Sequence, residues 1–182
     1  VMPPYGVGHS MPLWQVESDN RLAAAFLANM SALVYDFVVR QKLGGTNMTF
    51  GYVKQFPVLP PDRSTDADLG FIVPRVLELT YTAHDLSAWA KDLGHDGSPF
   101  AFDPDRRALL RAELDAYYAR LYGLTREELR YILNPADVMG DDYPSETFRV
   151  LKDREERDFS GDFRTRRLVL AAWDKLESGT LG

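Results

Sequence analysis

The side chains best suited to contact a partner lie in one short part of the sequence, between a long apolar segment and a proline-rich one. Its three cations can neutralise phosphates, and its threonine and asparagine can hydrogen-bond to phosphate oxygens or base edges. Its two adjacent glycines lack side chains, so a ligand can approach their backbone closely. We therefore predict a DNA-binding site made of Arg40, Lys42, Gly44, Gly45, Thr46, Asn47 and Lys54.

A structural role is the alternative explanation for part of this segment. Cations in the last turn of a helix complement the negative end of the helix dipole, which would account for Arg40 and Lys42 alone. Gly44 and Gly45 would end that helix by adopting positive φ angles that other residues resist. The sequence alone leaves both explanations open, DNA contact and a structural role at the helix end.

The elements expected to position these residues combine helix and strand. Residues 11–17 are predicted to form a short strand, and Asp19 is predicted to cap a helix over 20–42 whose apolar residues cover nearly all its sides. The next segment, 49–59, is typical of a strand, or of a short helical turn followed by an extended piece. Its prolines would confine a strand to a sheet edge.

The rest of the sequence has the spacing of amphipathic helices. One helix is predicted with Pro74 in its first turn, and the others begin at an Asp-Pro pair, at a Thr-x-x-Glu capping box, and further along. The predicted ranges are 74–93, 103–122, 125–133, 145–158 and 163–177. The fold class predicted is therefore α+β, mainly α-helical. A small mixed α/β N-terminal subdomain (1–61) is expected to pack on a helical C-terminal subdomain (70–182), and a polar linker (62–69) joins the two.

Composition limits the class of protein further. At 182 residues, with 45% hydrophobic and 26% charged residues, the chain is predicted to fold rather than to be disordered. It has no cysteine, which excludes disulfides and thiolate metal sites and fits a cytoplasmic protein. The chain opens without a signal-peptide pattern and unlike a natural start, so we expect it to be a fragment of a longer protein.

The net charge of −6 is unevenly distributed along the chain. Residues 1–61 carry +1, residues 62–144 carry −7, and residues 145–182 are balanced. A uniformly basic face for nucleic acid is therefore excluded, and any contact with nucleic acid must be local.

A family resemblance rests on the first part of the chain. The apolar helix with Leu27-Ala28-Asn29 and Tyr35-Asp36-Phe37-Val38, followed by Arg40-Gln41-Lys42, Gly44-Gly45-Thr46-Asn47 and residues 54–61, resembles the C-terminal region of type II restriction enzyme methylase subunits. These are the single-chain type IIG restriction–modification enzymes and related phage-defence DNA adenine-N6 methyltransferases. Residues 74–82 and 121–125 resemble the family's distal helices, and the likeness covers most of 6–178.

The resemblance implies a DNA-recognition role without catalysis in this chain. In the family an upstream Rossmann-like domain binds S-adenosylmethionine, and an Asn/Asp-Pro-Pro-Tyr/Phe signature holds a flipped adenine. Here Met2-Pro3-Pro4-Tyr5 lacks the amide or carboxylate, Asn134-Pro135-Ala136-Asp137 lacks the aromatic residue, and Gly6-Val7-Gly8 lacks the third glycine of a cofactor loop. We thus expect no catalytic, cofactor-binding or metal-binding residues here, while the full-length parent would use S-adenosylmethionine.

The expected partners are duplex DNA and the upstream methyltransferase domain of the same polypeptide, with no membrane. The alternative is a helical protein-interaction module that docks on the parent enzyme or on another defence-system subunit without touching DNA. An independent hydrolase that uses His9 or His84 is a third hypothesis, although the sequence marks no nucleophile, orienting acid or oxyanion site for it.

Overall fold

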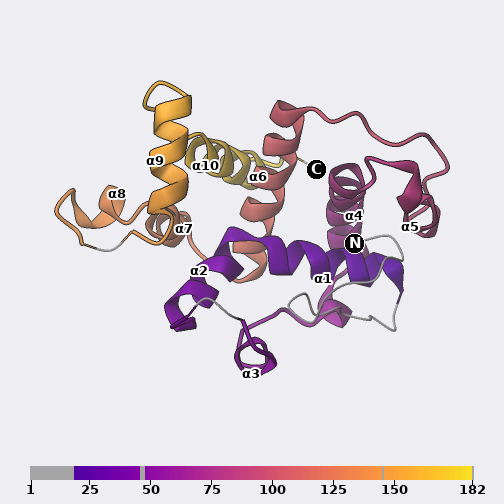
Figure 1. The fold of residues 1–182 in the computed structure, drawn as a ribbon, viewed down its shortest axis with the longest axis horizontal. Coiled ribbons are helices and arrows are strands. Elements are labelled where there is room, and N and C mark those ends of the chain that lie inside the picture. The colour runs from indigo at the N-terminus through magenta and orange to yellow at the C-terminus, as the bar shows by residue number, and fades with distance from the viewer. Residues whose placement is uncertain (1–18, 46–47, 145, 182) are drawn as a thin grey trace. The chain divides into compact units, whose positions relative to one another are not determined.

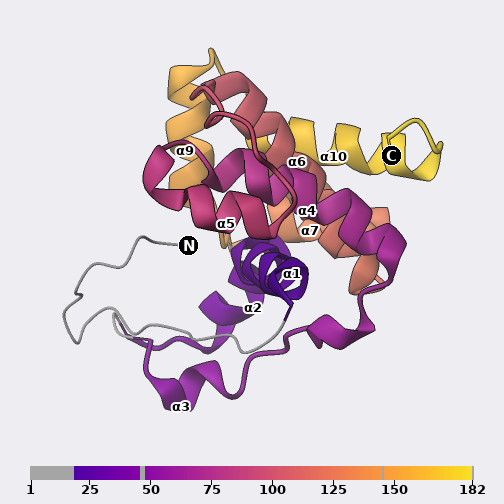
Figure 2. The same ribbon diagram turned by 90° about the vertical axis from the view of Figure 1, so that its right-hand side faces the viewer.

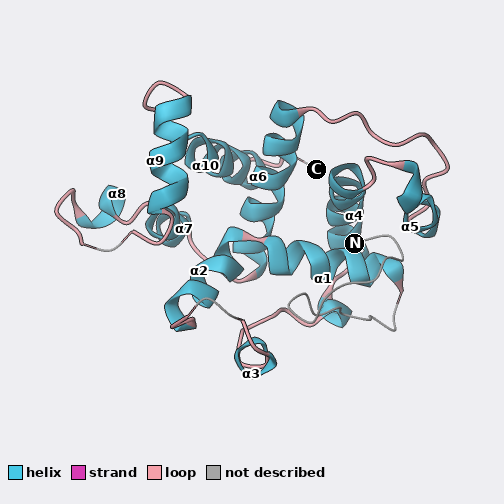
Figure 3. Cartoon of the chain, viewed as in Figure 1, coloured by secondary structure: helices cyan, strands magenta, loops and turns pink. Residues whose placement is uncertain are grey.

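The computed structural model describes residues 19–45, 48–144 and 146–181, and every regular element within these ranges is helical (Figures 1 and 3). The α-helices are α1 (Asn20–Ser31), α2 (Leu33–Lys42), α3 (Phe50–Val53), α4 (Asp66–Thr80), α5 (Ser87–Asp92), α6 (Pro104–Leu121), α7 (Arg126–Leu133), α8 (Ala136–Met139), α9 (Arg149–Asp158) and α10 (Arg164–Glu177). Two short 3₁₀ helices, η1 (Pro61–Arg63) and η2 (His84–Leu86), complete the set.

The predicted α+β fold class is wrong, because the described residues form no strand and the fold is all-α. The segment 49–59 takes the other form considered, a short helical turn followed by an extended piece. Its turn is closed locally by the Lys54 N–H, which donates to the Phe50 carbonyl at 3.1 Å. The strand predicted over 11–17 lies outside the described residues.

The chain divides into two compact units, and each draws on both halves of the sequence. Their described residues are 19–28 with 60–107 in the first unit, and 29–59 with 108–181 in the second. The predicted linker, 62–69, contains part of η1 and the first turn of α4. All described residues of the candidate DNA-binding site belong to the second unit.

In the first unit, α4 begins eight residues before Pro74 because its start is fixed by a capping box. The Thr65 side chain accepts from the Asp68 N–H, and the Asp68 carboxylate accepts from the Thr65 N–H at 2.7 Å. Pro74 therefore lies inside the helix, and the prediction that it occupies the first turn is wrong. The helix predicted to reach Leu93 ends at Thr80 instead, and η2 and α5 follow as separate pieces.

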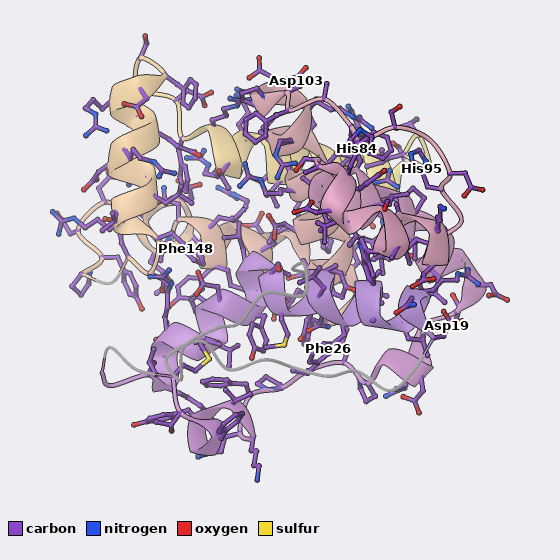
Figure 4. The ribbon with its side chains drawn as sticks, turned by 45° about the vertical axis from the view of Figure 1, so that its right-hand side comes forward. Asp19, Phe26, His84, His95, Asp103 and Phe148 are labelled. Carbon is purple, nitrogen blue, oxygen red and sulfur yellow. The ribbon has the colours of Figure 1, made fainter. Side chains whose placement is uncertain are left out.

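Aromatic rings hold the loop after α5 against this unit's small core. The His95 ring stacks on Phe100 with centroids 4.9 Å apart and meets Tyr81 edge-on at 5.7 Å. A Cβ at Gly97 would come within 2.9 Å of the His95 ring, so any other residue there would displace that ring. His95, which lies among Gly94, Asp96 and Gly97, is thus half-buried and contributes its ring to this packing (Figure 4).

In the second unit, α2, α6, α7 and α10 share one core. Small residues of α6 face larger ones from the neighbouring helices, which lets the backbones approach closely. Its buried members are Val34, Ala112, Ala116, Ala119, Leu129, Leu133, Val169, Ala172 and Trp173. The helix ends follow the predicted local signals: Asp103 accepts from the Asp105 and Arg106 N–H groups at the start of α6, and Thr125 forms a capping box with Glu128.

The single helix predicted over 20–42 is wrong, because α1 ends at Ser31 and α2 begins at Leu33. Between them Ala32 is extended, with φ −71° and ψ 143°. The N–H of Leu33 donates to the Asp115 carboxylate of α6 at 2.8 Å. A carboxylate from a distant helix thereby satisfies one of the N–H groups that a new helix start leaves open.

Within the described residues no single helix is long and apolar enough to cross a membrane. The pair α1 and α2 meets that criterion of length and composition only when the two helices are taken together across their bent break.

Replacing Asp115 with Asn should remove a decline in stability with rising pH. Burial raises the pKa of Asp115 to about 7, against the opposing effects of the Leu33 N–H and Arg111. Since the folded state then binds this proton more tightly than the unfolded chain, Asp115 lowers the free energy of unfolding as pH rises from its unfolded pKa toward 7. The slope is up to about 1.4 kcal/mol per pH unit, and it flattens above the folded pKa.

Urea denaturation from pH 4.5 to 8.5 tests this expectation. Asp115→Asn keeps an oxygen acceptor for Leu33 and should gain stability relative to the parent chain as the pH rises. Asp115→Ala, which removes the acceptor, should be less stable than Asp115→Asn at every pH. A constant stability difference between the parent chain and Asp115→Asn would contradict the role given to this carboxyl.

Candidate nucleic-acid interface

The C-terminal turn of α2 carries the first two cations of the predicted site. The helix ends at Lys42, and Leu43 is extended with φ −81° and ψ 101°. Neither Gly44 nor Gly45 has a positive φ, so the prediction that these glycines end the helix by adopting such angles is wrong. The helix-dipole explanation concerns only Arg40 and Lys42, so it gives Gly44 and Gly45 no role either.

Arg40 is engaged by neighbours on the protein. Its Nε lies 3.0 Å from the Asp36 carboxylate one turn earlier, and its guanidinium lies over the Phe148 ring, 5.6 Å from the centroid. Phe148 is the residue just before α9 (Figure 4). Next to Arg40, Gln41 donates from Nε2 to Thr147 Oγ1 at 3.2 Å. Arg40 therefore fixes the end of α2 against residues 147–148. Because Asp36 partly neutralises its charge, Arg40 is less available than a free cation to bind a phosphate.

Lys42 and Lys54 differ from Arg40, because both are exposed and neither forms an ion pair with a described residue. Most cations of the C-terminal helices are paired with carboxylates. The paired cations include Arg126, Arg130, Arg149, Lys152, Arg157, Arg166 and Arg167. Thr46 and Asn47 lie outside the described residues.

The sequence from Phe37 to Pro61 contains no Asp or Glu. Its only charged residues are Arg40, Lys42 and Lys54, so the stretch carries +3 in a chain of net charge −6. Like charges with no acids between them attract a polyanion locally even when the whole protein is acidic.

Phe56 anchors the segment that carries Lys54. It is buried against Tyr35 and Val39 of α2, and its ring meets Tyr35 edge-on with centroids 5.9 Å apart. Met30 and Val58 complete this small cluster. α3, just before the anchor, lies outside the group formed by α6, α7, α9 and α10 (Figures 1 and 2).

A hydrogen-bonded tyrosine holds the chain just after the anchor. Tyr122 Oη lies 2.9 Å from the Pro57 carbonyl and 2.9 Å from the side-chain amide of buried Asn29. A hydroxyl has one proton to donate, and the Asn29 Nδ2 otherwise has no partner. We therefore assign the amide nitrogen to the side facing Tyr122, so that Asn29 donates to Tyr122 and Tyr122 donates to Pro57. Burial raises the pKa of Tyr122, which keeps the proton that this chain of bonds needs.

The glycines of this segment are not explained by the fold. Several other glycines have positive φ angles, and Gly97 has no room for a Cβ. Gly44 and Gly45 have neither constraint, since a Cβ added at either position would meet nothing within 4 Å. Gly51 is similar, with only Thr49 Oγ1 at 3.7 Å, which is an ordinary contact. Close approach by a partner remains a reason for glycine at these positions.

The exposed apolar side chains beside these glycines were not predicted from the sequence. Met48, Phe50 and Tyr52 are 44%, 61% and 37% exposed. The sequence predicted the secondary structure of 49–59 but not the exposure of these side chains. The signal in the sequence is their place beside Gly44, Gly45 and Gly51 in the acid-free stretch from Phe37 to Pro61.

The second near match to the methyltransferase signature is part of a structural network. Asn134 is buried, and its Nδ2 donates to Asp137 at 2.6 Å while its Oδ1 accepts from Lys152 at 3.3 Å. Lys152 also donates to Glu146 at 2.7 Å, and this hydrogen bond raises the pKa of Lys152. Asn134 is thus occupied by its own neighbours. The other near match, at 2–5, and the Gly6-Val7-Gly8 turn lie outside the described residues.

A cleft of about 240 Å³ in the first unit is lined by two histidines, with Ser87 and Asp96 among its other residues. No hydrogen bond joins His84, Ser87 and Asp96, and the Nε2 of His95 lies 3.3 Å from the Ser98 carbonyl. A serine hydrolase needs a base bonded to its nucleophile, so this cleft lacks the arrangement required by the hydrolase hypothesis. His9 lies outside the described residues. Among the residues that the structure describes, no cluster of three or more His, Asp or Glu is placed to hold a metal ion.

Comparison with protein families, curated proteins and solved structures finds no match to this chain.

Replacing Tyr122 with Phe should loosen the attachment of residues 57–59. The change removes one hydroxyl and leaves both Asn29 and the Pro57 carbonyl without that partner, which should cost about 1–3 kcal/mol of unfolding free energy. Urea denaturation measures this cost. Tyr143→Phe, which removes a hydroxyl bonded to Tyr131 at 3.0 Å, is the control and should cost less, because one group rather than two loses its partner. Equal costs would argue against a special role for Tyr122.

Proposed function

We propose that this chain is the DNA-recognition-associated C-terminal fragment of a restriction–modification DNA adenine methyltransferase. In this proposal it positions duplex DNA for an upstream catalytic domain of the same polypeptide. That domain would bind S-adenosylmethionine and transfer the methyl group, so the fragment alone would neither methylate nor cleave DNA. The protein would act in the cytoplasm, in phage defence.

The observation that carries the proposal is the pair of exposed lysines on an acid-free stretch. Lys42 and Lys54 stand on either side of residues 43–53, and neither has a carboxylate partner among the described residues. A surface ion pair contributes little to stability, so an unpaired lysine costs the fold almost nothing and stays available to a phosphate. An acidic chain that keeps such a stretch free of Asp and Glu is suited to a local polyanion contact.

The predicted residues take different roles in this proposal. Lys42 and Lys54 neutralise phosphates, whereas Arg40 mainly holds the end of α2 through Asp36 and Phe148. Gly44 and Gly45 let the DNA backbone approach, which gives a reason for glycines that the fold does not require. Thr46 and Asn47 remain predicted contacts to phosphate oxygens or base edges.

A helical protein-interaction module is the second candidate. Val138, Met139 and Val150 of α8 and α9 are 41%, 56% and 85% exposed, which favours a partner that covers apolar side chains. In this alternative the chain would dock on the parent enzyme or another defence subunit, and Lys42 and Lys54 would make no difference to DNA binding.

Replacing both lysines with glutamine should reduce the salt dependence of DNA binding. Each lost phosphate contact lowers the slope of log affinity against log salt concentration by about 0.9 for duplex DNA. The double variant Lys42→Gln with Lys54→Gln should therefore have a slope smaller by about 2. Fluorescence anisotropy with a labelled duplex, from 50 to about 200 mM salt, measures the slope over the range where such contacts are most visible.

The matched control is the double variant Lys91→Gln with Lys175→Gln. It removes the same charge from two other exposed lysines that have no ion pair among the described residues. It should keep the parent slope, because those lysines lie outside the acid-free stretch. If both double variants change the slope equally, the effect is one of net charge, and the proposed contact is wrong.

A further inference from the structure

α3 presents an aromatic ring to solvent that the fold does not use. Phe50 is 61% exposed, and its neighbours Met48 and Tyr52 are also more than a third exposed. None of the four residues Phe50–Val53 is buried, and Phe56, the one buried residue of 48–60, anchors the segment in the core formed with Tyr35 and Val39. An exposed aromatic cluster on an unburied helical turn lowers solubility and adds nothing to the core, which is typical of a surface that meets a ligand.

The exposed ring and one of the unpaired cations lie on the same side of this turn. The Lys54 N–H donates to the Phe50 carbonyl at 3.1 Å, and Lys54 has helical angles, φ −63° and ψ −14°. Residues four apart in such a turn are neighbours on one face. Phe50 and Lys54 thus offer a flat apolar ring beside a positive charge.

A glycine leaves room next to this pair. Gly51 lies inside α3, its φ is not positive, and a Cβ there would meet only Thr49 Oγ1 at 3.7 Å. Alanine would therefore fit, and it would favour the helical turn by up to about 1 kcal/mol. The fold gains nothing from glycine at 51, whereas a ligand that approaches the backbone beside Phe50 would.

We infer that Phe50 stacks on a nucleobase that has left the double-helical stack, with Lys54 on a neighbouring phosphate. This inference rests on the proposed function, which supplies DNA as the partner. It adds that the preferred DNA has unpaired bases at the contact. A base within a duplex has both faces covered by its neighbours, so an aromatic side chain finds a free face only where pairing is locally broken.

Charge selects this partner over the others that an exposed ring could meet. The stretch from Phe37 to Pro61 has three cations and no acid, which suits a polyanion and gives an apolar protein surface no added attraction. An anionic lipid surface shares the negative charge but has no planar ring to stack on Phe50. A nucleobase can lie flat on the Phe50 ring beside Gly51, whereas a lipid surface would take up the ring by insertion, so the lipid surface becomes an outcome of the test.

The test compares two DNA probes of equal length and equal phosphate number, a perfect duplex and the same duplex with a short central mismatched bubble. Anisotropy with the 182-residue chain should give tighter binding to the bubble. Phe50→Ala should weaken bubble binding roughly tenfold and change duplex binding little, because base stacking on an aromatic residue is lost. Phe50→Trp should retain the preference.

Two further variants separate folding from binding. Gly51→Ala should keep or raise the thermal unfolding midpoint and still weaken bubble binding, because its methyl group takes space at the contact. Phe102→Ala removes an aromatic residue that is 70% exposed in the first unit, and it should leave both probes unaffected.

Every outcome bears on one of the two proposals. If Phe50→Ala weakens both probes equally or neither, the stacking inference is overturned, while the salt slope of the lysine variants still decides the proposed function. If the lysine variants leave both probes unchanged, the proposed function fails, and the inference fails with it. If Phe50→Ala instead abolishes binding to vesicles containing an anionic lipid and the bubble is not preferred, the partner is a lipid surface and the inference is overturned.

Discussion

The hydrogen bond from the Leu33 N–H to the Asp115 carboxylate is the contact on which the rest of the second unit depends. It allows a new helix to begin at Leu33, after the extended Ala32, and it ties that start to α6. The direction of α2 then sets where Tyr35 and Val39 lie, and these two residues bury Phe56. The cost is a carboxyl held away from water, which burial leaves with a pKa of about 7.

The candidate interface combines a fixed part, anchored by Phe56, with an exposed tip formed by residues 48–54. Full burial of a phenylalanine is worth about 1.5–3 kcal/mol, so Phe56, with Val58 packed beside it, makes the main apolar contribution that holds this segment against α2. Tyr122 adds a hydrogen bond at Pro57, immediately after that anchor. Before it, Met48, Phe50, Tyr52 and Lys54 are left exposed on a turn closed by its own backbone bonds and by the Gln55 side chain, which donates to the Gly51 carbonyl at 2.9 Å. Such a tip can adjust to a partner at little cost to the fold, since few of its contacts must break.

The elements that could be predicted from the sequence are those whose signals are local. Asp103 and the Thr125–Glu128 box mark the starts of α6 and α7, and Gly123, with φ 76°, follows the end of α6. The break at Ala32 could not be predicted, because its cause is a carboxylate 82 residues further along the chain from Leu33. The predicted sheet failed for a related reason: an extended segment with prolines becomes a strand only beside a partner, and sequence pattern does not reveal one.

The residue types of the candidate site could be predicted from the sequence, but the exposure and ion pairing of each side chain could not all be predicted. The pairing of Arg40 with Asp36 follows a helical spacing of four, yet the exposure of Phe50 depends on how Phe56 packs. Lysine labelling with acetic anhydride, read by mass spectrometry with and without saturating duplex DNA, shows whether the two unpaired lysines contact DNA. Bound DNA should protect Lys42 and Lys54 from labelling and should not protect Lys91 or Lys175. Unchanged labelling of Lys42 and Lys54 in the presence of bound DNA would contradict the proposed contact.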